Sequence, residues 1–277
     1  MRKIKENEMD HIYQIEEVKD GIWHIDEGGL ASAYIVRGDD RGLVIDTGTG
    51  VGDLKGLAEQ YLSVPYDVVL THGHVDHAGG ISQFDRVYVN KGDKEMANGI
   101  TRKDREEYIS RMNRVKATAV MPGEIVPKLR TEIKPEYLPV KSGDVFHLGG
   151  RELEVTECPG HTTGSICLTD KADRIVFTGD SMNDLELICA PAENRMELLR
   201  QWYESAYKIL TGCEEVELCC GGHAVFAPEK AWEVLECGKK VLDHEIEMKR
   251  MKLHIFIGNF AKYRNSCITV DEALERI

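Results

Sequence analysis

Short apolar runs separated by glycine and acidic residues dominate the first part of the chain. GIWHID, SAYIVRG and GLVIDTG each combine β-branched or aromatic residues with polar neighbours, which is typical of β-strands. RGDDRG, between the last two, is rich in turn-forming residues, so residues 32–47 are predicted to form a hairpin. The runs DVVL and RVYV predict two further strands.

Helical spacing marks two other segments. VGDLKGLAEQYL, at 51–62, has the apolar spacing of a helix. Residues 91–135 are more charged, with the helical stretches KEMANGI and DREEYISRMNRV and then the proline-bearing MPGEIVPKL. They predict a helical insertion at about 91–135. Such an insertion is either a lid or substrate wall beside a site or a peripheral decoration, and its length does not decide between them.

The second part of the chain repeats the pattern. Strands are predicted at YLPV, DVFHL, RELEVTE, SICLTD and RIVFTGD, then a helix at 194–210, the strand VELCC and a helix from about 228 to 250. LHIFIGNFAKYRNSCITV predicts two strands around a turn. This order predicts an α/β layered fold built from two similar halves. Because no low-complexity tract or flexible linker interrupts the chain, we expect a single domain over residues 1–277.

Charge narrows the class of partner. The 277 residues include 35 Lys and Arg against 48 Asp and Glu, a formal net charge of −13. This argues against a general binder of nucleic acid or of anionic membranes. MRKIKENEMDHIYQIEEV has no apolar run of signal-peptide length, and no stretch approaches the roughly 20 apolar residues of a membrane span. We expect a cytoplasmic protein acting on a small molecule, with its oligomeric state open.

The cysteines predict no disulfide framework. Eight of them are irregularly spaced, and no CxxC pair occurs. In a reducing compartment thiols are the default, so we expect them to be small core residues.

The stretch LTHGHVDHAGG places four metal-ligand-type side chains within six positions, His72, His74, Asp76 and His77. Neutral imidazole and carboxylate are the ligands of zinc and similar divalent metals. His72, His74 and Asp76 alternate, so in an extended loop they point to one side. His77 points elsewhere until the chain turns at residues 78–80, so this segment can supply ligands to two metal ions.

Three later motifs add ligand-type residues at predicted strand ends beside glycine: His161 in CPGHTTGS, Asp180 in VFTGD and His223 in ELCCGGH. Strand ends on a rigid sheet hold a site accurately. The other histidines have contexts that converge on none of these motifs, and we expect them to be structural: His11, His24, His147, His244 and His254.

THGHVDHAGG, PGHTTGS, FTGD and GGH, in this order and at these distances, resemble the metallo-β-lactamase fold superfamily of hydrolases. The hairpin SAYIVRGDDRGLVIDTG also matches the family's opening motif, and the resemblance runs from about Gly21 to His223. It implies a four-layer αββα sandwich with two metal ions in a cleft at one edge of the sheets.

The resemblance also implies the ligands. His72, His74 and His161 would bind the first metal ion, Asp76, His77 and His223 the second, and Asp180 would bridge both. Asp46 matches a position that supports the metal loop and need not be a ligand itself. The implied cofactor is a pair of divalent ions, zinc first, with iron or manganese as alternatives.

The function implied is hydrolysis of a small ester, thioester or lactone by a metal-bridging hydroxide, with Asp76 as the catalytic residue that orients it or accepts its proton. A bridging aspartate is similar to the glyoxalase II and lactonase branches, so a hydroxyacylglutathione hydrolase-like thioesterase is the specific expectation. The basic glutathione contacts of that enzyme are not identifiable here, and the C-terminal segment does not resemble its helical substrate domain.

Other chemistries use the same residues. A mononuclear iron persulfide dioxygenase needs two histidines and an aspartate, which are a subset of the seven. A small-molecule phosphodiesterase or a β-lactamase is a further alternative, although secreted β-lactamases usually lack an aspartate bridge.

Overall fold

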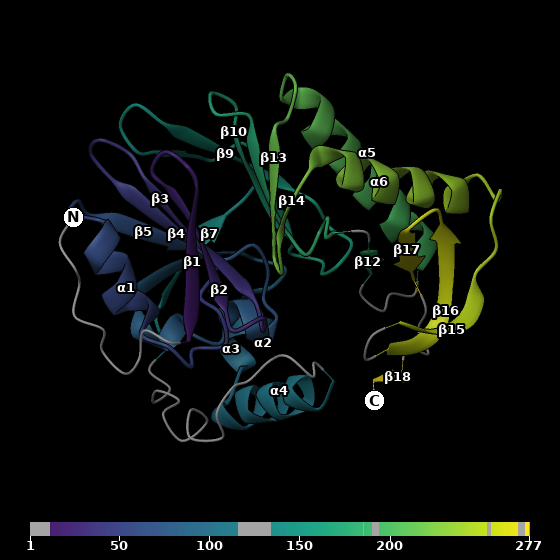
Figure 1. Ribbon diagram of the computed structural model, residues 1–277, viewed down its shortest axis with the longest axis horizontal. Coiled ribbons are helices and arrows are strands. Elements are labelled where there is room, and N and C mark those ends of the chain that lie inside the picture. The colour runs from purple at the N-terminus through teal and green to yellow at the C-terminus, as the bar shows by residue number, and fades with distance from the viewer. Residues whose placement is uncertain are drawn as a thin grey trace.

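The computed structural model describes residues 12–115, 134–184, 186–189, 194–253, 256–270 and 275–276. Two sheets pack face to face, and helices cover their outer faces (Figure 1). The first sheet runs in sequence order: β1 (Tyr13–Lys19), β2 (Ile22–Glu27), β3 (Ser32–Arg37), β4 (Gly42–Ile45), β5 (Tyr66–Val69), β6 (Arg86–Asn90) and β7 (Glu136–Val140).

The second sheet has the order β14-β13-β11-β10-β9-β8. Its strands are β8 (Val145–His147), β9 (Glu152–Glu157), β10 (Ile166–Asp170), β11 (Ile175–Gly179), β13 (Leu218–Gly221) and β14 (Val225–Phe226). The α-helices are α1 (Leu54–Tyr61), α2 (Val75–Ala78), α3 (Lys94–Gly99), α4 (Arg102–Val115), α5 (Arg195–Gly212) and α6 (Pro228–Leu242).

Successive side chains along each strand point to opposite faces of the sheet, so each sheet packs against a different layer on each face. In β3, Ala33 and Ile35 pack in the cluster that contains α1, whereas Tyr34 and Val36 face the second sheet. Such two-sided strands read as continuous apolar runs because both faces are buried. In the second sheet, Val176 faces the cluster of α5 and α6. Helix, sheet, sheet and helix therefore stack in four layers, and the predicted αββα fold is confirmed.

The hairpin predicted at residues 32–47 is formed by β3 and β4, which pair antiparallel. β1 was not predicted, because its sequence YQIEEVK is mostly polar and most of its residues lie toward solvent. Its antiparallel pairing with β2 makes it a strand. Backbone pairing with β2 thus determined the secondary structure of a segment whose own hydrophobic pattern was ambiguous.

The C-terminal region differs from the prediction. The helix expected to reach about 250 ends at Leu242, where Asp243 caps it and His244 has a φ of 58°. The charged residues 249–253 instead form β15 (Lys249–Leu253), because they pair antiparallel with β16 (Phe256–Tyr263). β16 and β17 (Ser266–Thr269) are the two strands expected around a turn.

These strands belong to a third sheet, of order β12-β17-β16-β15, with β18 (Glu275–Arg276) paired to β16. β12 (Glu186–Ile188) joins it from the middle of the chain. Ala261 and Ile268 of this sheet share one apolar cluster with α5 and α6. The helical layer is therefore covered on both sides (Figure 1).

In the predicted insertion, the structure gives α3 and α4, and MPGEIVPKL lies outside the described residues. All eight cysteines are buried and form no disulfide, as expected of core thiols. Within the described ranges, no helix is both long and apolar enough to cross a membrane.

Candidate metal centre

The seven candidate ligands meet where strands of the two central sheets end. His72 and His74 follow β5, His161 lies between β9 and β10, Asp180 follows β11, and His223 lies between β13 and β14. The alternation of ligand-type residues suggested an extended segment after His74, but the structure does not form one. Instead α2 forms, with the backbone N–H groups of His77 and Ala78 donating to His74 O. This single turn carries both Asp76 and His77.

The first ligand group consists of His72, His74 and His161, and one nitrogen from each ring lies within 4.8 Å of the others. His74 Nδ1 is 2.8 Å from His161 Nε2. The ring centroid of His72 lies 4.9 Å from that of His74 and 4.8 Å from that of His161. Three imidazoles at this spacing are the donor set of a tetrahedral zinc site with one open position.

The second ligand group consists of Asp76, His77 and His223, again with ligand atoms within 4.8 Å of one another. His77 Nε2 and His223 Nε2 both lie 3.6 Å from Asp76 Oδ2. The side chain of His223 is 31% exposed, whereas that of His77 is fully buried. The centre therefore opens to solvent on the His223 side.

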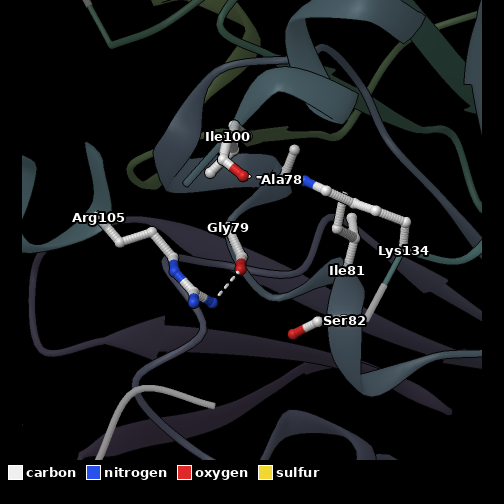
Figure 2. A pocket seen from close by; sticks show the side chains of 7 residues that line it. All are labelled: Ala78, Gly79, Ile81, Ser82, Ile100, Arg105 and Lys134. Carbon is white, nitrogen blue, oxygen red and sulfur yellow. Dashed lines mark hydrogen bonds between the residues drawn. The ribbon is translucent and has the colours of Figure 1, made fainter. Parts of the chain in front are cut away.

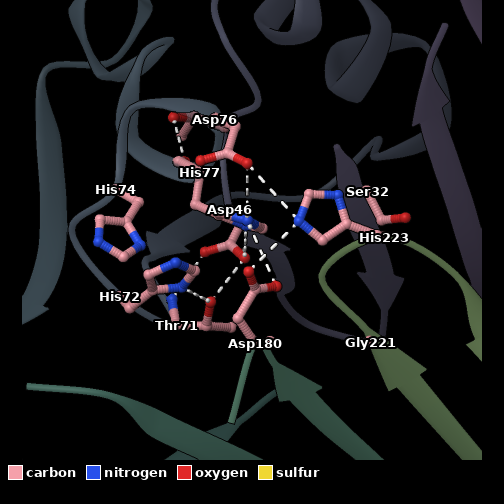
Figure 3. A network of polar contacts seen from close by, with 12 residues as sticks. Ser32, Asp46, Thr71, His72, His74, Asp76, His77, Asp180, Gly221 and His223 are labelled. Carbon is pink, nitrogen blue, oxygen red and sulfur yellow. Dashed lines mark hydrogen bonds and ion pairs between the residues drawn. The ribbon is translucent and has the colours of Figure 1, made fainter. Parts of the chain in front are cut away.

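Asp180 lies between the two groups (Figure 3). Its Oδ2 is 3.4 Å from His161 Nε2 and 3.3 Å from His223 Nε2, and its Oδ1 is 3.6 Å from His77 Nε2. One carboxylate thus reaches one histidine of the first group and two of the second, which is the placement that a bridging ligand requires.

Buried polar atoms without partners support a metal at this centre. His72 Nε2, His77 Nε2 and Asp180 Oδ1 are buried and accept or donate no hydrogen bond. Buried polar atoms are almost always hydrogen-bonded, so these three atoms on ligand residues of both groups fit a metal ion at this place as their partner. Gly222 keeps that place open, because a Cβ there would lie 2.0 Å from Asp180 Oδ1. The residues fit a metal centre.

Histidine pKa values shift in opposite directions in the two groups. Burial holds the pKa of His72 well below its usual range, and the neighbouring His77 and His161 lower it further. Burial, followed by the neighbouring His161, lowers the pKa of His74 to about 3. Both rings are therefore neutral at physiological pH, which is the form that binds metal.

In the second group, burial would lower the pKa of His77, but Asp76, Asp180 and Asp46 raise it to about 10. The pKa of His223 is also raised: burial opposes the shift, and Asp180 more than offsets it. Burial would raise the pKa of Asp180, yet the surrounding histidines hold it well below its usual range. The carboxylates therefore stay ionised and attract positive charge, from protons or from a metal ion.

Asp46 supports the His-rich segment, as its family position implied. Its Oδ2 is 3.0 Å from His77 Nδ1 and accepts a hydrogen bond from Thr71 Oγ1 at 2.7 Å, while its Oδ1 accepts one from Thr71 N. Thr71 Oγ1 is in turn 3.1 Å from His72 Nδ1. A carboxylate on the far nitrogen of a histidine fixes which nitrogen is free for metal. Asp46 has a φ of 62°, a strained backbone for a residue other than glycine.

Tyr108 is a site residue that sequence reasoning did not single out. Its hydroxyl donates to Asp76 Oδ2 at 2.7 Å. It comes from α4, more than 30 residues away from the His-rich segment, and no local pattern distinguishes it from other tyrosines. Two histidines expected to be structural have partners other than the ligands: His24 is 2.7 Å from Ser32 Oγ, and His147 pairs with Glu152. His11 and His254 lie outside the described residues.

Residues 26–223 match the model of the Metallo-beta-lactamase superfamily. The chain belongs to this superfamily. Its matched segment contains all seven candidate ligands, and the hairpin and both ligand groups lie within it.

Known relatives agree with this assignment. The chain is 36% identical over 194 residues to "Acyl-coenzyme A thioesterase MBLAC2" of Homo sapiens, which covers 64% of this chain and 68% of that protein. The Bos taurus protein of the same name is 34% identical over the same shares. A solved metallo-beta-lactamase from Pontibacter korlensis superposes with a TM-score of 0.55 at 16% identity, covering 82% of this chain and 99% of that one. The similarity to this solved structure concerns the fold alone.

Proposed function

We propose that this protein is a metal-dependent thioesterase that hydrolyses acyl-coenzyme A. The observation that carries the proposal is the set of seven candidate ligands within a chain that is 36% identical over 194 residues to an acyl-coenzyme A thioesterase. The hydroxyacylglutathione substrate expected from the sequence shares the thioester bond but not the carrier. The relatives named above favour coenzyme A as that carrier.

The two ligand groups would hold two divalent ions, with zinc as the first candidate because of their imidazole-rich donors. When bound, such ions polarise a carbonyl oxygen and lower the pKa of water toward neutrality. The fully buried His72 and His77 exclude bulk solvent from the inner side of the centre, and the exposed side of His223 leaves an entry for substrate.

The reaction requires a water oxygen to bond to the thioester carbonyl carbon and the C–S bond to break, which gives a carboxylic acid and a thiol. Burial would raise the pKa of Asp76, but His77 and His223 lower it overall, so its carboxylate stays ionised and can accept a hydrogen bond that orients that water. A thiol leaving group with an ordinary pKa of about 8.5 departs as thiolate without a dedicated acid. This chemistry therefore needs no further proton donor from the chain.

Charge and apolar surface near the insertion suit this substrate. Residues 91–135 contain 11 Lys and Arg against 7 Asp and Glu, a net charge of +4 in a chain of −13. Coenzyme A carries phosphates, which a locally basic segment attracts. Met96 of α3 is 42% exposed, and its Cβ lies beside Gly73 of the His-rich segment. It offers an apolar contact for an acyl chain.

A substrate panel tests the proposal. Thiol release from acyl-coenzyme A esters of several chain lengths is compared with hydrolysis of S-lactoylglutathione, lactones, β-lactams and phosphodiesters, with oxygen uptake on glutathione persulfide as a separate assay. We expect kcat/KM for a coenzyme A ester to exceed every other by at least about tenfold. Chelation should abolish the activity and Zn²⁺ should restore it. Preference for glutathione esters, or activity that survives chelation, would overturn the proposal.

A further inference from the structure

Helix α4 of the insertion contacts the metal-binding turn α2 at two points. The first is Arg105, which is only 1% exposed and donates through Nη1 to Gly79 O at 2.9 Å (Figure 2). Gly79 caps the C-terminus of α2. A guanidinium at the carbonyl end of a helical turn interacts favourably with its dipole. Arg105 therefore anchors the turn that carries Asp76 and His77.

The second contact is the hydroxyl of Tyr108, which lies 2.7 Å from Asp76 Oδ2 and 3.1 Å from Leu30 O. A phenol has one proton, and the shorter bond to the charged oxygen is the stronger one. Residues 105 and 108 are three apart in α4 and so share one face of the helix. Each of these two residues therefore contacts the segment that carries Asp76 and His77.

The position of α4 is set by packing. Ile109 and Met112 lie in one apolar cluster with Leu30 and Val51. Ile109 is fully buried, and burying a side chain of this size contributes roughly 1.5–3 kcal/mol. The Tyr108 hydroxyl is therefore presented to Asp76 by a fixed helix and not by a mobile loop.

We propose that Tyr108 is a positioning residue of the metal centre, whose hydroxyl orients the Asp76 carboxylate toward the second ligand group. The terminal torsion of an aspartate is broad, so its carboxylate rotates unless a partner holds it. Partners of metal ligands typically contribute 10- to 100-fold in metal affinity. Helix α4 of the insertion is then part of the metal centre and not a peripheral decoration. This inference rests on the metal centre and not on which substrate is hydrolysed.

The test is Tyr108→Phe, which removes the hydroxyl and keeps the ring. Binding of two Zn²⁺ ions is measured by calorimetry and by competition with a chromophoric chelator. We expect affinity at the second ligand group to fall about tenfold, while affinity at the first is unchanged. The matched control is Tyr263→Phe, since Tyr263 donates to Glu236 Oε1 at 2.9 Å outside the centre. It should bind both ions as the unaltered protein does.

A second variant separates positioning from packing. Ile109→Ala leaves a cavity beside α4 but keeps the hydroxyl, so it should lower the Tm of the metal-free protein by more than Tyr108→Phe, which removes one hydrogen-bond donor and keeps the ring. The inference is overturned if Tyr108→Phe binds both ions normally, or if it weakens both equally together with a lower Tm. Because no substrate is used, this outcome is independent of the thioesterase proposal.

Discussion

The two ligand groups lie at the same edge of the same two sheets but differ in chemistry. The first group is three imidazoles, and burial lowers the pKa of His72 and His74 so that their nitrogens are free. The second group mixes a carboxylate with two imidazoles, and the carboxylates around His77 raise its pKa to about 10. A metal ion entering the first group meets neutral donors, whereas one entering the second replaces protons.

The groups also differ in which residues support them. In the second group, Asp46 hydrogen-bonds to His77, and Tyr108 donates a hydrogen bond to Asp76. The backbone N–H and the hydroxyl of Thr47 both donate to His77 O. In the first group, the hydroxyl of Thr71 contacts His72, and the buried Asp93 accepts hydrogen bonds from Gly73 N, Thr162 Oγ1 and Gly164 N in the loops that carry the three histidines. In the second group, the hydrogen bond from Tyr108 is made directly to a charged ligand, and such a bond matters because an unpaired buried charge is costly. Three changes test this difference.

Removing the carboxylate that reaches both groups should have the largest effect. Asp180→Ala should lower kcat/KM by about a thousandfold or more, because it removes several kcal/mol of electrostatic stabilisation. It should also reduce the bound metal measured by mass spectrometry. Two matched controls are Asp184→Ala, where Asp184 pairs with Lys230 outside the centre, and His147→Ala at an exposed pair. Near-normal turnover of Asp180→Ala would show that the two groups share no bridge.

A change at Glu27 tests how the loop beneath the second group is held in place. Its buried carboxylate accepts hydrogen bonds from Thr49 N and Val51 N, in the loop that precedes α1 and contacts the glycines after His77. Burial raises the pKa of Glu27 to about 7, and these backbone hydrogen bonds limit the rise. The folded state thus binds this proton more tightly than the unfolded state. The stability that Glu27 contributes is greatest below its unfolded pKa and is lost as the pH rises through about 7.

Glu27→Gln removes this titration. The free energy of unfolding of the metal-free original protein, minus that of the variant, should fall by about 2–3 kcal/mol between roughly pH 5 and pH 8. Urea unfolding at a series of pH values measures it. Any constant effect of the amide cancels in the slope, as do the metal ligands common to both proteins. Two stability curves that stay parallel would contradict the assignment.

Asp46→Asn should have a smaller effect, concentrated in the second group. The amide keeps the size of the side chain but no longer holds the proton on His77 Nδ1 with a charge, so Zn²⁺ affinity there should fall about 10- to 100-fold. The first group should lose less, because Asp46 hydrogen-bonds directly to His77 and its hydrogen-bonded path to His72 runs through Thr71. Zinc titration measures both affinities, with Asp67→Asn, at a surface pair with Arg41, as the control. Equal losses of Zn²⁺ affinity at both groups would show that Asp46 does not support the second group in particular.

Local chemistry made the seven candidate ligands predictable, since imidazoles and carboxylates crowded at strand ends are costly to bury unless a metal ion or another partner pairs them. The apolar runs of β3, β4 and β5 were equally informative, because both faces of these strands are buried. The end of α6 was not predictable: residues after Leu242 have helical composition, and their pairing with β16 overrides it. β1 became a strand for the same reason.

The sequence by itself determined which residues bear metal-binding chemistry and which segments are buried, because both depend on residue type and spacing along the chain. Only the tertiary structure decided which groups surround those ligands. Tyr108 and Arg105 reach α2 from a helix whose own pattern is unremarkable, and Glu27 reaches the loop before α1 from the end of β2. Such contacts join residues far apart in sequence, and their geometry is fixed by packing that no local pattern encodes.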